Sequence, residues 1–358
     1  RRQRQMCIRD RINIKGVGDF FSLDIGTNAI RAVQLSKAGE NSWNLVGLGY
    51  TPVDPQLVLS NSDESRRRLG EIISTMIGQS DIKTKNVAIS LTSQKTFTTI
   101  FEVPKQDMRE LQKNIKYQVD QYIPMAVDDA QVDWALLGES PSNSDSLEIL
   151  LASTAKKYSE EKMEFIEGLG LNVVASEPDS LAMTRALFVP NQSDQAQLII
   201  DMGELSTDLS IVYQGVPRLV RTIPTGISSL VKSATQNLNI KEDQARQFIM
   251  KFGLAQDKLE GQVFRAIEMT LENFVQEIAK SIKFLGTKYQ NAQVGVISLS
   301  GFSGIIPQMP EYVSSKTGIQ SYSANPFQNI NVPAKYQQQI ASVGNEFAVA
   351  VGLAERSN

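Results

Sequence analysis

The most informative segment of the sequence is Leu23-Asp24-Ile25-Gly26-Thr27-Asn28. It closes an apolar run, Phe20 to Asp24, with an aspartate and a glycine, which predicts a buried strand that turns sharply at its end. About half a chain later, Leu198-Ile199-Ile200-Asp201-Met202-Gly203 is a second apolar run ending in Asp-x-Gly. In both places two further strand-like segments follow, separated by a turn. The repetition predicts an internally duplicated α/β fold.

The rest of the chain supplies further strands and several helices. Alternating or short apolar segments predict strands at Ala29 to Leu35, Trp43 to Tyr50, Asn86 to Ser90, Thr96 to Val103, Val132 to Leu137, Leu147 to Ser153, Leu209 to Tyr213, Pro217 to Ile223 and Val294 to Leu299. Helical spacing predicts helices over Glu64 to Ile77, from Pro104 to Tyr122, from Leu230 to Leu238 and along the Leu259 to Leu285 stripe. Asn239, with Glu242 three residues on, is expected to cap the start of the next helix.

Composition excludes several classes of chemistry. The chain has 358 residues, which suits two domains or one large two-lobed domain. It has no histidine and one cysteine, which excludes histidine-based nucleophile pairs, histidine-ligated zinc, disulfide frameworks and cysteine-based metal sites. No apolar run reaches the roughly 18 residues expected of a membrane-spanning helix. A site in this protein must therefore rely on carboxylates, backbone amides, lysines, arginines and a bound cofactor.

Residues 1–11 are expected to be an artefact. The peptide Arg1-Arg2-Gln3-Arg4-Gln5-Met6-Cys7-Ile8-Arg9-Asp10-Arg11 can be back-translated into a string that resembles a transposase-type sequencing adapter. The alternative is a basic arm that binds nucleic acid or anionic lipid. Removing five arginines and one aspartate from 36 basic and 39 acidic residues leaves 31 and 38. The net charge would then change from −3 to −7, and the only cysteine would be lost.

The two Asp-x-Gly turns predict a clamp for phosphate and metal. Glycine lets backbone N–H groups approach phosphate oxygens, and a strand-end aspartate can hold Mg²⁺ through water. Additional hydroxyl or amide donors follow the turns at Thr27, Asn28, Ser206 and Thr207. The alternative is ordinary hairpin punctuation. The third glycine turn, Gly301-Phe302-Ser303-Gly304, also follows a buried strand and favours a nucleotide.

The same turns carry a family resemblance. Asp24 to Arg31 resembles the first phosphate motif of the actin-like ATPase superfamily, and Asp201 to Asp208 resembles its second. Leu299 to Gly304 resembles the adenosine motif, with Phe302 where a second glycine is usual. The resemblance implies ATP bound with Mg²⁺, with Asp24 and Asp201 holding the metal through water. The implied cofactor-binding residues are Asp24, Gly26, Thr27, Asn28, Arg31, Asp201, Gly203, Ser206, Thr207, Gly301, Phe302, Ser303 and Gly304.

Within that superfamily the chain resembles the PilM family of type IV pilus assembly, relatives of the cell-division protein FtsA. The segments that carry this resemblance are Tyr117-Gln118-Val119-Asp120-Gln121-Tyr122-Ile123-Pro124 with Asp133-Trp134, Arg221 to Gly226 with Gln244-Ala245-Arg246, and Gly344 to Ala354. The resemblance covers residues 20–355. It implies the actin-like ATPase fold, with duplicated ribonuclease-H-like lobes, an inserted subdomain 1C of the SHS2 type and no subdomain 1B.

The resemblance also implies domain boundaries. After residues 1–11, they are 12–90 and 171–192 for subdomain 1A, 91–170 for 1C, 193–229 and 292–340 for 2A, 230–291 for 2B, and 341–358 for the return to 1A. PilM-like proteins bind the cytoplasmic tail of the membrane protein PilN in a groove between 1A and 1C. The helix face that ends in Tyr117 and Tyr122 suits such a groove, although core packing would explain the same tyrosines.

Hydrolysis is less clearly indicated than binding. Glu177, in Ser176-Glu177-Pro178-Asp179, is the candidate to orient an attacking water. Its alternative role is a carboxylate favoured by a helix N-terminus. Lys280 and Ser281 are candidates to contact the adenosine. The alternative is that Lys280 is a solvated surface lysine and that Ser281 has only a packing role. At most a slow ATPase is expected.

The sequence is compatible with three functions. The favoured one is a cytoplasmic, nucleotide-dependent scaffold, held at the inner membrane through a PilN-like tail and other pilus platform proteins and open to self-association. The alternatives are an FtsA-like filament protein and a small-molecule kinase of the same fold. No kinase motif is evident, and the chain ends in the polar Glu355-Arg356-Ser357-Asn358 instead of the amphipathic helix typical of FtsA. The acidic balance argues against nucleic acid.

Overall fold

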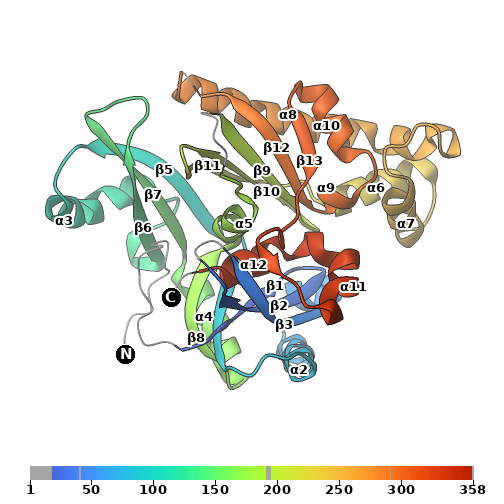
Figure 1. The fold of residues 1–358 in the computed structure, drawn as a ribbon, viewed down its shortest axis with the longest axis horizontal. Coiled ribbons are helices and arrows are strands. Elements are labelled where there is room, and N and C mark those ends of the chain that lie inside the picture. Colours follow the sequence, from blue (N-terminus) through green and yellow to red (C-terminus); the bar gives the residue numbers. More distant parts are fainter. Residues whose placement is uncertain (1–17, 40–41, 191–194, 291, 357–358) are drawn as a thin grey trace. The chain divides into compact units, whose positions relative to one another are not determined.

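The chain folds into two compact units (Figure 1). The computed structural model describes residues 18–39, 42–190, 195–290 and 292–356. Within these residues, unit 1 holds the chain up to Ala186, Phe327–Gln339 and the chain from Val349, and unit 2 holds Leu187–Pro326 and Ile340–Ala348. The expectation for residues 1–11 lies outside the described residues and stays a prediction.

Unit 1 is built on a six-stranded sheet with the order β14-β3-β2-β1-β4-β8. Its strands are β1 (Phe21–Ile25), β2 (Ala29–Lys37), β3 (Trp43–Pro52), β4 (Asn86–Leu91), β8 (Asn172–Pro178) and β14 (Ile330–Asn331). The first three strands form an antiparallel meander, and β4 and β8 continue the sheet in parallel. Because β1 lies in the middle of the sheet, the turn that follows it is held by strands on both sides.

Helices cover the sheet of unit 1. They are α1 (Pro55–Leu59), α2 (Asp63–Gln79), α4 (Lys156–Gly168), α5 (Asp179–Leu187), α12 (Ala348–Ala354) and the first part of α11 (Ala334–Val343), whose last residues belong to unit 2. The Ser62 hydroxyl accepts a hydrogen bond from the amide of Ser65 at 3.2 Å and starts α2. Ile73 and Met76 of α2 are buried in one cluster with Leu23, so the apolar face of α2 fixes one side of the sheet.

A small three-stranded sheet is inserted into unit 1 (Figure 1). It has the antiparallel order β5-β7-β6, with β5 (Thr96–Pro104), β6 (Ala130–Glu139), β7 (Ser146–Ala155), helix α3 (Met108–Gln118) and the single turns η1 (Val119–Gln121) and η2 (Val127–Asp129). Leu111 and Ile115 of α3 pack on it. The helix predicted from Pro104 begins later, because Pro104 ends β5 and the Asp107 carboxylate caps the helix.

Unit 2 repeats the strand plan of unit 1. Its sheet has the order β11-β10-β9-β12-β13, with β9 (Ala196–Met202), β10 (Thr207–Tyr213), β11 (Val216–Ile223), β12 (Val294–Gly301) and β13 (Gln320–Ser323). An antiparallel meander is again followed by two parallel strands. The order matches β3-β2-β1-β4-β8 strand for strand. The duplication predicted from the two Asp-x-Gly runs is therefore confirmed.

The helices of unit 2 are α6 (Ile227–Leu238), α7 (Glu242–Phe252), α8 (Gln262–Lys288), α9 (Phe302–Ile305) and α10 (Met309–Thr317), with the turns η3 (Leu259–Gly261) and η4 (Gly344–Phe347). The predicted stripe is buried along α8, for example at Ile267, Phe274 and Ile278. The capping prediction for Asn239 is wrong. Asn239 ends α6 in a left-handed conformation, φ 52°, and Lys241 precedes α7, because asparagine also tolerates this conformation at helix C-termini.

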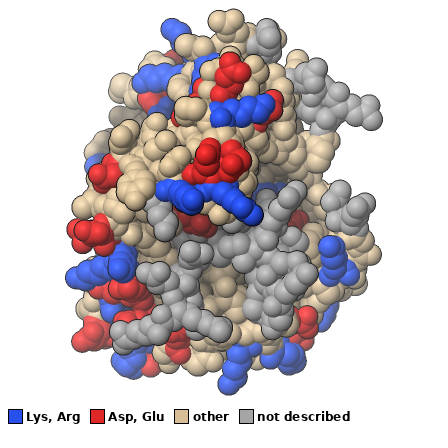
Figure 2. Space-filling view, turned by 90° about the vertical axis from the view of Figure 1, so that its left-hand side faces the viewer, with Lys and Arg blue, Asp and Glu red and all other residues tan. Residues whose placement is uncertain are grey.

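Two surface properties bear on function. On the face that Figure 2 shows, Lys and Arg side chains are interspersed with Asp and Glu side chains among the described residues. The described residues visible on this face therefore do not form the continuous basic surface typical of nucleic-acid binding. None of the helices formed by the described residues is long and apolar enough to cross a membrane.

Candidate functional site

The first phosphate motif forms a closed polar cluster in unit 1. Asp24 on β1 lies opposite Arg31 on β2, and an Arg31 guanidinium nitrogen donates to Asp24 Oδ2 at 3.3 Å. The Ser90 hydroxyl, from β4, donates to Asp24 Oδ1 at 2.9 Å. Asp24 is only 5% exposed. Both carboxylate oxygens therefore have partners within the protein, and these contacts hold Asp24 in place at the end of β1.

Gly26 allows Arg31 to reach back across this turn. The Arg31 guanidinium also donates to the Ala29 carbonyl and to Asn28 Oδ1, both at 3.2 Å. A Cβ on Gly26 would lie 2.6 Å from an Arg31 nitrogen, closer than atoms can pack. Thr27 lies in the same turn and is partly exposed. The structure thus brings together all five residues that the first motif predicted for phosphate.

The second phosphate motif forms the corresponding turn in unit 2. Asp201 on β9 pairs in register with Asp208 on β10. The Gly203 amide donates to the Ser206 carbonyl at 2.8 Å and closes the turn. Thr207, which is fully buried, donates its hydroxyl to the Thr225 carbonyl at 2.6 Å. Thr207 therefore anchors the turn through its side chain.

The start of α6 packs against this turn. The Ile227 amide donates to the Gly203 carbonyl at 3.1 Å, and the Ser228 amide donates to the Glu204 carbonyl at 3.0 Å. Gly226 permits this approach, because a Cβ there would lie 2.3 Å from the Glu204 carbonyl oxygen. The turn is thus fixed by backbone hydrogen bonds that do not depend on a bound ligand.

The adenosine motif lies beside the second phosphate turn within unit 2. Parallel pairing of β12 with β9 puts Ser300 level with Asp201. Gly301 has φ +59°, and a Cβ on it would lie 2.7 Å from Asp201 Oδ1. Close backbone approach to the aspartate therefore requires glycine here. The Ser303 hydroxyl donates to the Ser300 carbonyl at 2.7 Å, so it supports the turn.

Phe302 and Gly304 complete this motif. Phe302 is 8% exposed and belongs to the main apolar core of unit 2. Its ring therefore serves packing, which explains how the chain accommodates a large side chain where the superfamily usually has glycine. A Cβ on Gly304 would lie 2.7 Å from the Leu299 carbonyl oxygen, so the short helix α9 closes tightly onto β12.

Glu204 and Arg246, which were not predicted as site residues from the sequence, connect the second phosphate turn with the adenosine motif. The Arg246 guanidinium, from α7, forms a two-pronged ion pair with Glu204, with one N–O distance of 3.2 Å. The centre of the guanidinium lies 5.9 Å from the centre of the Phe302 ring. The Gln244-Ala245-Arg246 segment pointed to the family, but no local pattern paired it with a carboxylate 42 residues away.

Lys280 and Ser281 lie in a different polar cluster of unit 2. Lys280 bonds Glu277 at 2.5 Å, and Arg221 of β11 bonds Glu277 at 2.6 Å and Ser281 at 3.3 Å. The hydrogen bonds from Lys280 and Arg221 hold the pKa of Glu277 below its ordinary value. In the described part of the chain, the polar contacts of these two predicted adenosine residues stay between α8 and β11, so their role toward a nucleotide remains a prediction.

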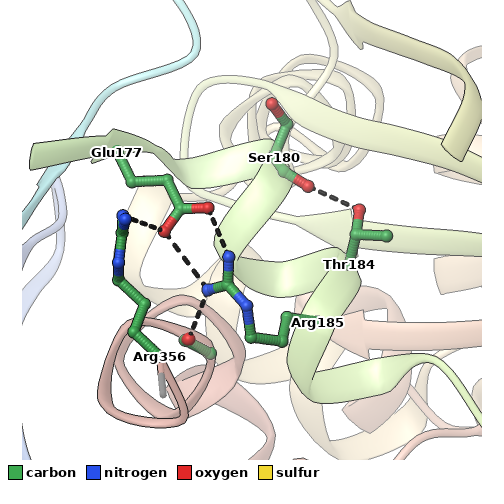
Figure 3. Close-up of polar contacts among 6 residues, drawn as sticks. Glu177, Ser180, Thr184, Arg185 and Arg356 are labelled. Atoms are coloured by element: carbon green, nitrogen blue, oxygen red, sulfur yellow. Dashed lines mark hydrogen bonds and ion pairs between the residues drawn. The ribbon is translucent and has the colours of Figure 1, made fainter. Parts of the chain in front are cut away.

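Glu177 lies in a buried ion-pair cluster of unit 1 (Figure 3). Its carboxylate accepts from Arg185 at 2.6 and 3.2 Å and from Arg356 at 3.0 Å, and it is 1% exposed. Burial opposes its ionisation, but the charges of Arg185 and Arg356 outweigh burial and keep its pKa below the ordinary value. Arg185 also donates to the Gly352 carbonyl at 2.7 Å. This geometry favours a structural carboxylate that joins α5 to the chain after α12.

The two tyrosines predicted for a partner groove differ in environment. Tyr117, on α3, is 81% exposed. Tyr122 stacks on Phe101 with ring centres 3.8 Å apart and packs against the core of the small sheet. The Tyr117 side chain is therefore accessible to a partner, whereas Tyr122 packs under the surface against the core of the small sheet.

Comparison with known proteins identifies the family. The family described as type IV pilus assembly protein PilM matches residues 22–358.

The chain belongs to the PilM family.

Solved structures with a similar fold and one curated relative also match this chain. The PilM-PilN type IV pilus biogenesis complex has a similar chain, with a TM-score of 0.79, 21% identity and coverage of 94% of this chain and 98% of that one. MreB 5 of Spiroplasma citri bound to AMPPNP has a TM-score of 0.53, 11% identity and coverage of 93% and 94%. The cell division protein FtsA of Neisseria meningitidis serogroup B is 24% identical over 67% of this chain and 62% of its own length, so the match spans less than two thirds of FtsA. The predicted actin-like ATPase fold is confirmed.

Proposed function

We propose that this PilM-family chain is an ATP-binding scaffold of the type IV pilus platform and binds the cytoplasmic tail of a PilN-like membrane protein. Its place would be at the inner face of the cytoplasmic membrane, reached through its partners. Family membership supports the pilus role, and the similar chain in a PilM-PilN complex supports the partner. Contacts with other platform proteins and self-association belong to the same proposal.

One observation carries the nucleotide part. Within unit 2 the second phosphate turn and the adenosine motif lie side by side, with the Gly301 backbone against Asp201. A turn with a glycine at this point lets a phosphate or sugar approach the backbone closely. These residues fit a nucleotide.

The donor set fits Mg²⁺ only as an ion that keeps its waters. The described residues form no cluster of three or more carboxylate or cysteine side chains that could cage a metal. Mg²⁺ is commonly held by one or two carboxylates, with waters and substrate phosphates as its other ligands. Asp24 in unit 1 and Asp201 in unit 2 are each proposed to hold Mg²⁺ through water.

The buried ion pairs of Glu177 support a scaffold more than a fast enzyme. A residue that orients an attacking water must present a carboxylate oxygen to it. Both Glu177 oxygens already accept hydrogen bonds from arginines. We therefore expect the rate of any slow ATP hydrolysis to stay the same when Glu177 is replaced by a residue that keeps the hydrogen bonds to the arginines.

Calorimetric titration with Mg-ATP tests the nucleotide part. Asp24→Ala and Asp201→Ala should each weaken binding at least about tenfold, the effect of losing roughly 1.4 kcal/mol of charge-assisted contact. Asp257→Ala, an exposed aspartate of unit 2, is the matched control and should bind like the wild type. Equal affinity in all four proteins would reject the clamp.

The FtsA match keeps one alternative in view. An FtsA-like protein forms filaments, so sedimentation with and without Mg-ATP separates the two functions. We expect the chain to stay in the supernatant with ATP alone. Pelleting that requires ATP and proceeds without a PilN-like tail would favour the filament.

A further inference from the structure

A buried carboxylate stands next to the second phosphate turn. Glu204 follows Gly203 directly, and its side chain is 6% exposed. A carboxylate out of water at this point would repel an incoming phosphate, because like charges interact strongly where the surroundings are poorly polarisable. A phosphate turn with this residue needs a compensating cation.

Arg246 supplies that cation from another element. Its guanidinium bonds both Glu204 oxygens from the side of α7, a two-pronged geometry that arginine forms and lysine does not. The Arg246 side chain is 37% exposed, against 6% for Glu204. The carboxylate is therefore covered while part of the guanidinium still faces water. A guanidinium has five N–H donors, so donors remain for a further acceptor.

The surroundings hold this guanidinium in place. It lies near the ring of buried Phe302, which itself follows Gly301 of the adenosine motif. The Glu204 backbone is fixed in turn, because its carbonyl accepts from the Ser228 amide at the start of α6. Arg246 is therefore positioned at the meeting point of the second phosphate turn and the adenosine motif.

We propose that the Glu204–Arg246 pair sets the affinity of this turn for polyphosphate. Arg246 cancels the Glu204 charge and offers its remaining donors to the phosphates of a nucleoside triphosphate. Arg246 thus raises the affinity of the turn for phosphate, and its ion pair with Glu204 limits that effect. The inference rests on the proposed nucleotide binding and adds the residues that tune it.

The test uses the full chain and three probes: ATP, tripolyphosphate and adenosine. Arg246→Met leaves Glu204 uncompensated and should weaken ATP and tripolyphosphate binding at least about tenfold. Glu204→Gln frees the guanidinium and should tighten both about threefold or more. The double variant removes both the repulsion and the donors, so its affinity for ATP and tripolyphosphate should lie between those of the two single variants. Arg246→Lys keeps the positive charge but loses the two-pronged pair, so it should weaken ATP and tripolyphosphate binding, by less than Arg246→Met does. Adenosine binding should not change in any variant.

A matched control removes one cation from the same helix. Lys251 is exposed on α7, so Lys251→Met changes the net charge as Arg246→Met does and should leave all three affinities unchanged. Urea denaturation of each protein verifies that the variants are folded.

Three outcomes would overturn the inference. If Glu204→Gln and Arg246→Met weaken ATP alike, the pair only supports the fold. If Arg246→Met weakens adenosine and spares tripolyphosphate, Arg246 contacts the base. If the wild type binds ATP normally and no variant differs from it, the pair plays no part in binding. If the wild type binds neither ATP nor tripolyphosphate, the proposed nucleotide function is rejected, and this inference is rejected with it.

Discussion

Replacing Glu355 by glutamine should remove most of the pH dependence of stability between pH 5 and 8. Glu355 follows α12 and is partly buried. Burial raises the pKa of its carboxyl from the ordinary 4.5 to about 7, although the charge of Arg185 opposes this. The chain has no histidine, so the side chain that usually titrates in this window is absent.

The sign follows from proton binding. Between pH 4.5 and 7 the folded protein keeps the Glu355 proton and the unfolded chain loses it, so stability falls as the pH rises. A rise in the pKa from 4.5 to about 7 corresponds to about 3 kcal/mol. Because Glu355 is only partly shielded from water, the measured loss should lie at or below this value.

Urea denaturation at pH 5, 6, 7 and 8 measures the effect. The wild type should lose up to about 3 kcal/mol over this range, while Glu355→Gln should stay nearly flat and exceed the wild type at pH 8. Glu164→Gln, at an exposed position of α4, is the control and should follow the wild type. A flat wild-type profile, or the same slope in Glu355→Gln, would refute the argument.

Further substitutions test the packing and the partner surface. Gly301→Ala should lower the free energy of unfolding by more than about 2 kcal/mol, because its φ is +59° and a Cβ would meet a backbone oxygen at 2.3 Å. The control Gly286→Ala, at a position on α8 with open space around it, should leave the free energy of unfolding equal or raise it by up to about 1 kcal/mol. Similar urea curves for the two variants would contradict this expectation. Arg356→Met should cost about 2–3 kcal/mol, since its buried carboxylate partner loses one of two arginines, and an unchanged urea midpoint would argue against the cluster. Tyr117→Ala should weaken binding of a PilN-like tail peptide, measured by calorimetry, without loss of stability. Tyr122→Ala should lower the free energy of unfolding, measured by urea denaturation, by about 2–4 kcal/mol. If Tyr117→Ala lowers stability and leaves peptide binding unchanged, Tyr117 is not part of the partner surface.

Strands with clear apolar patterns could be predicted from the sequence, and those defined by distant contacts could not. The β1 and β9 runs are almost entirely buried, so their composition alone identifies central strands. By contrast, β14 has two residues and exists because it pairs with β3 nearly 290 positions earlier. No local pattern encodes such a pairing.

The candidate site divides in the same way. The glycines at 26 and 301 were predictable, since each follows an apolar run; Gly301 is required by its positive φ and by backbone contact, and Gly26 leaves room for the Arg31 guanidinium. Pairing of Glu204 with Arg246 and of Glu177 with Arg356 depends on tertiary structure. A sequence shows that such charged residues exist, but it does not show which buried carboxylate a given arginine will neutralise.

Titration with the tail peptide tests the proposed scaffold function. The ligand is a synthetic peptide of the cytoplasmic tail of a PilN-like protein, added to the full chain with and without Mg-ATP, with a scrambled peptide as the control. We expect saturable one-to-one binding of the tail peptide and no binding of the scrambled peptide. No binding of the tail peptide in either condition, in a protein that binds Mg-ATP, would contradict the scaffold function while leaving the nucleotide site intact.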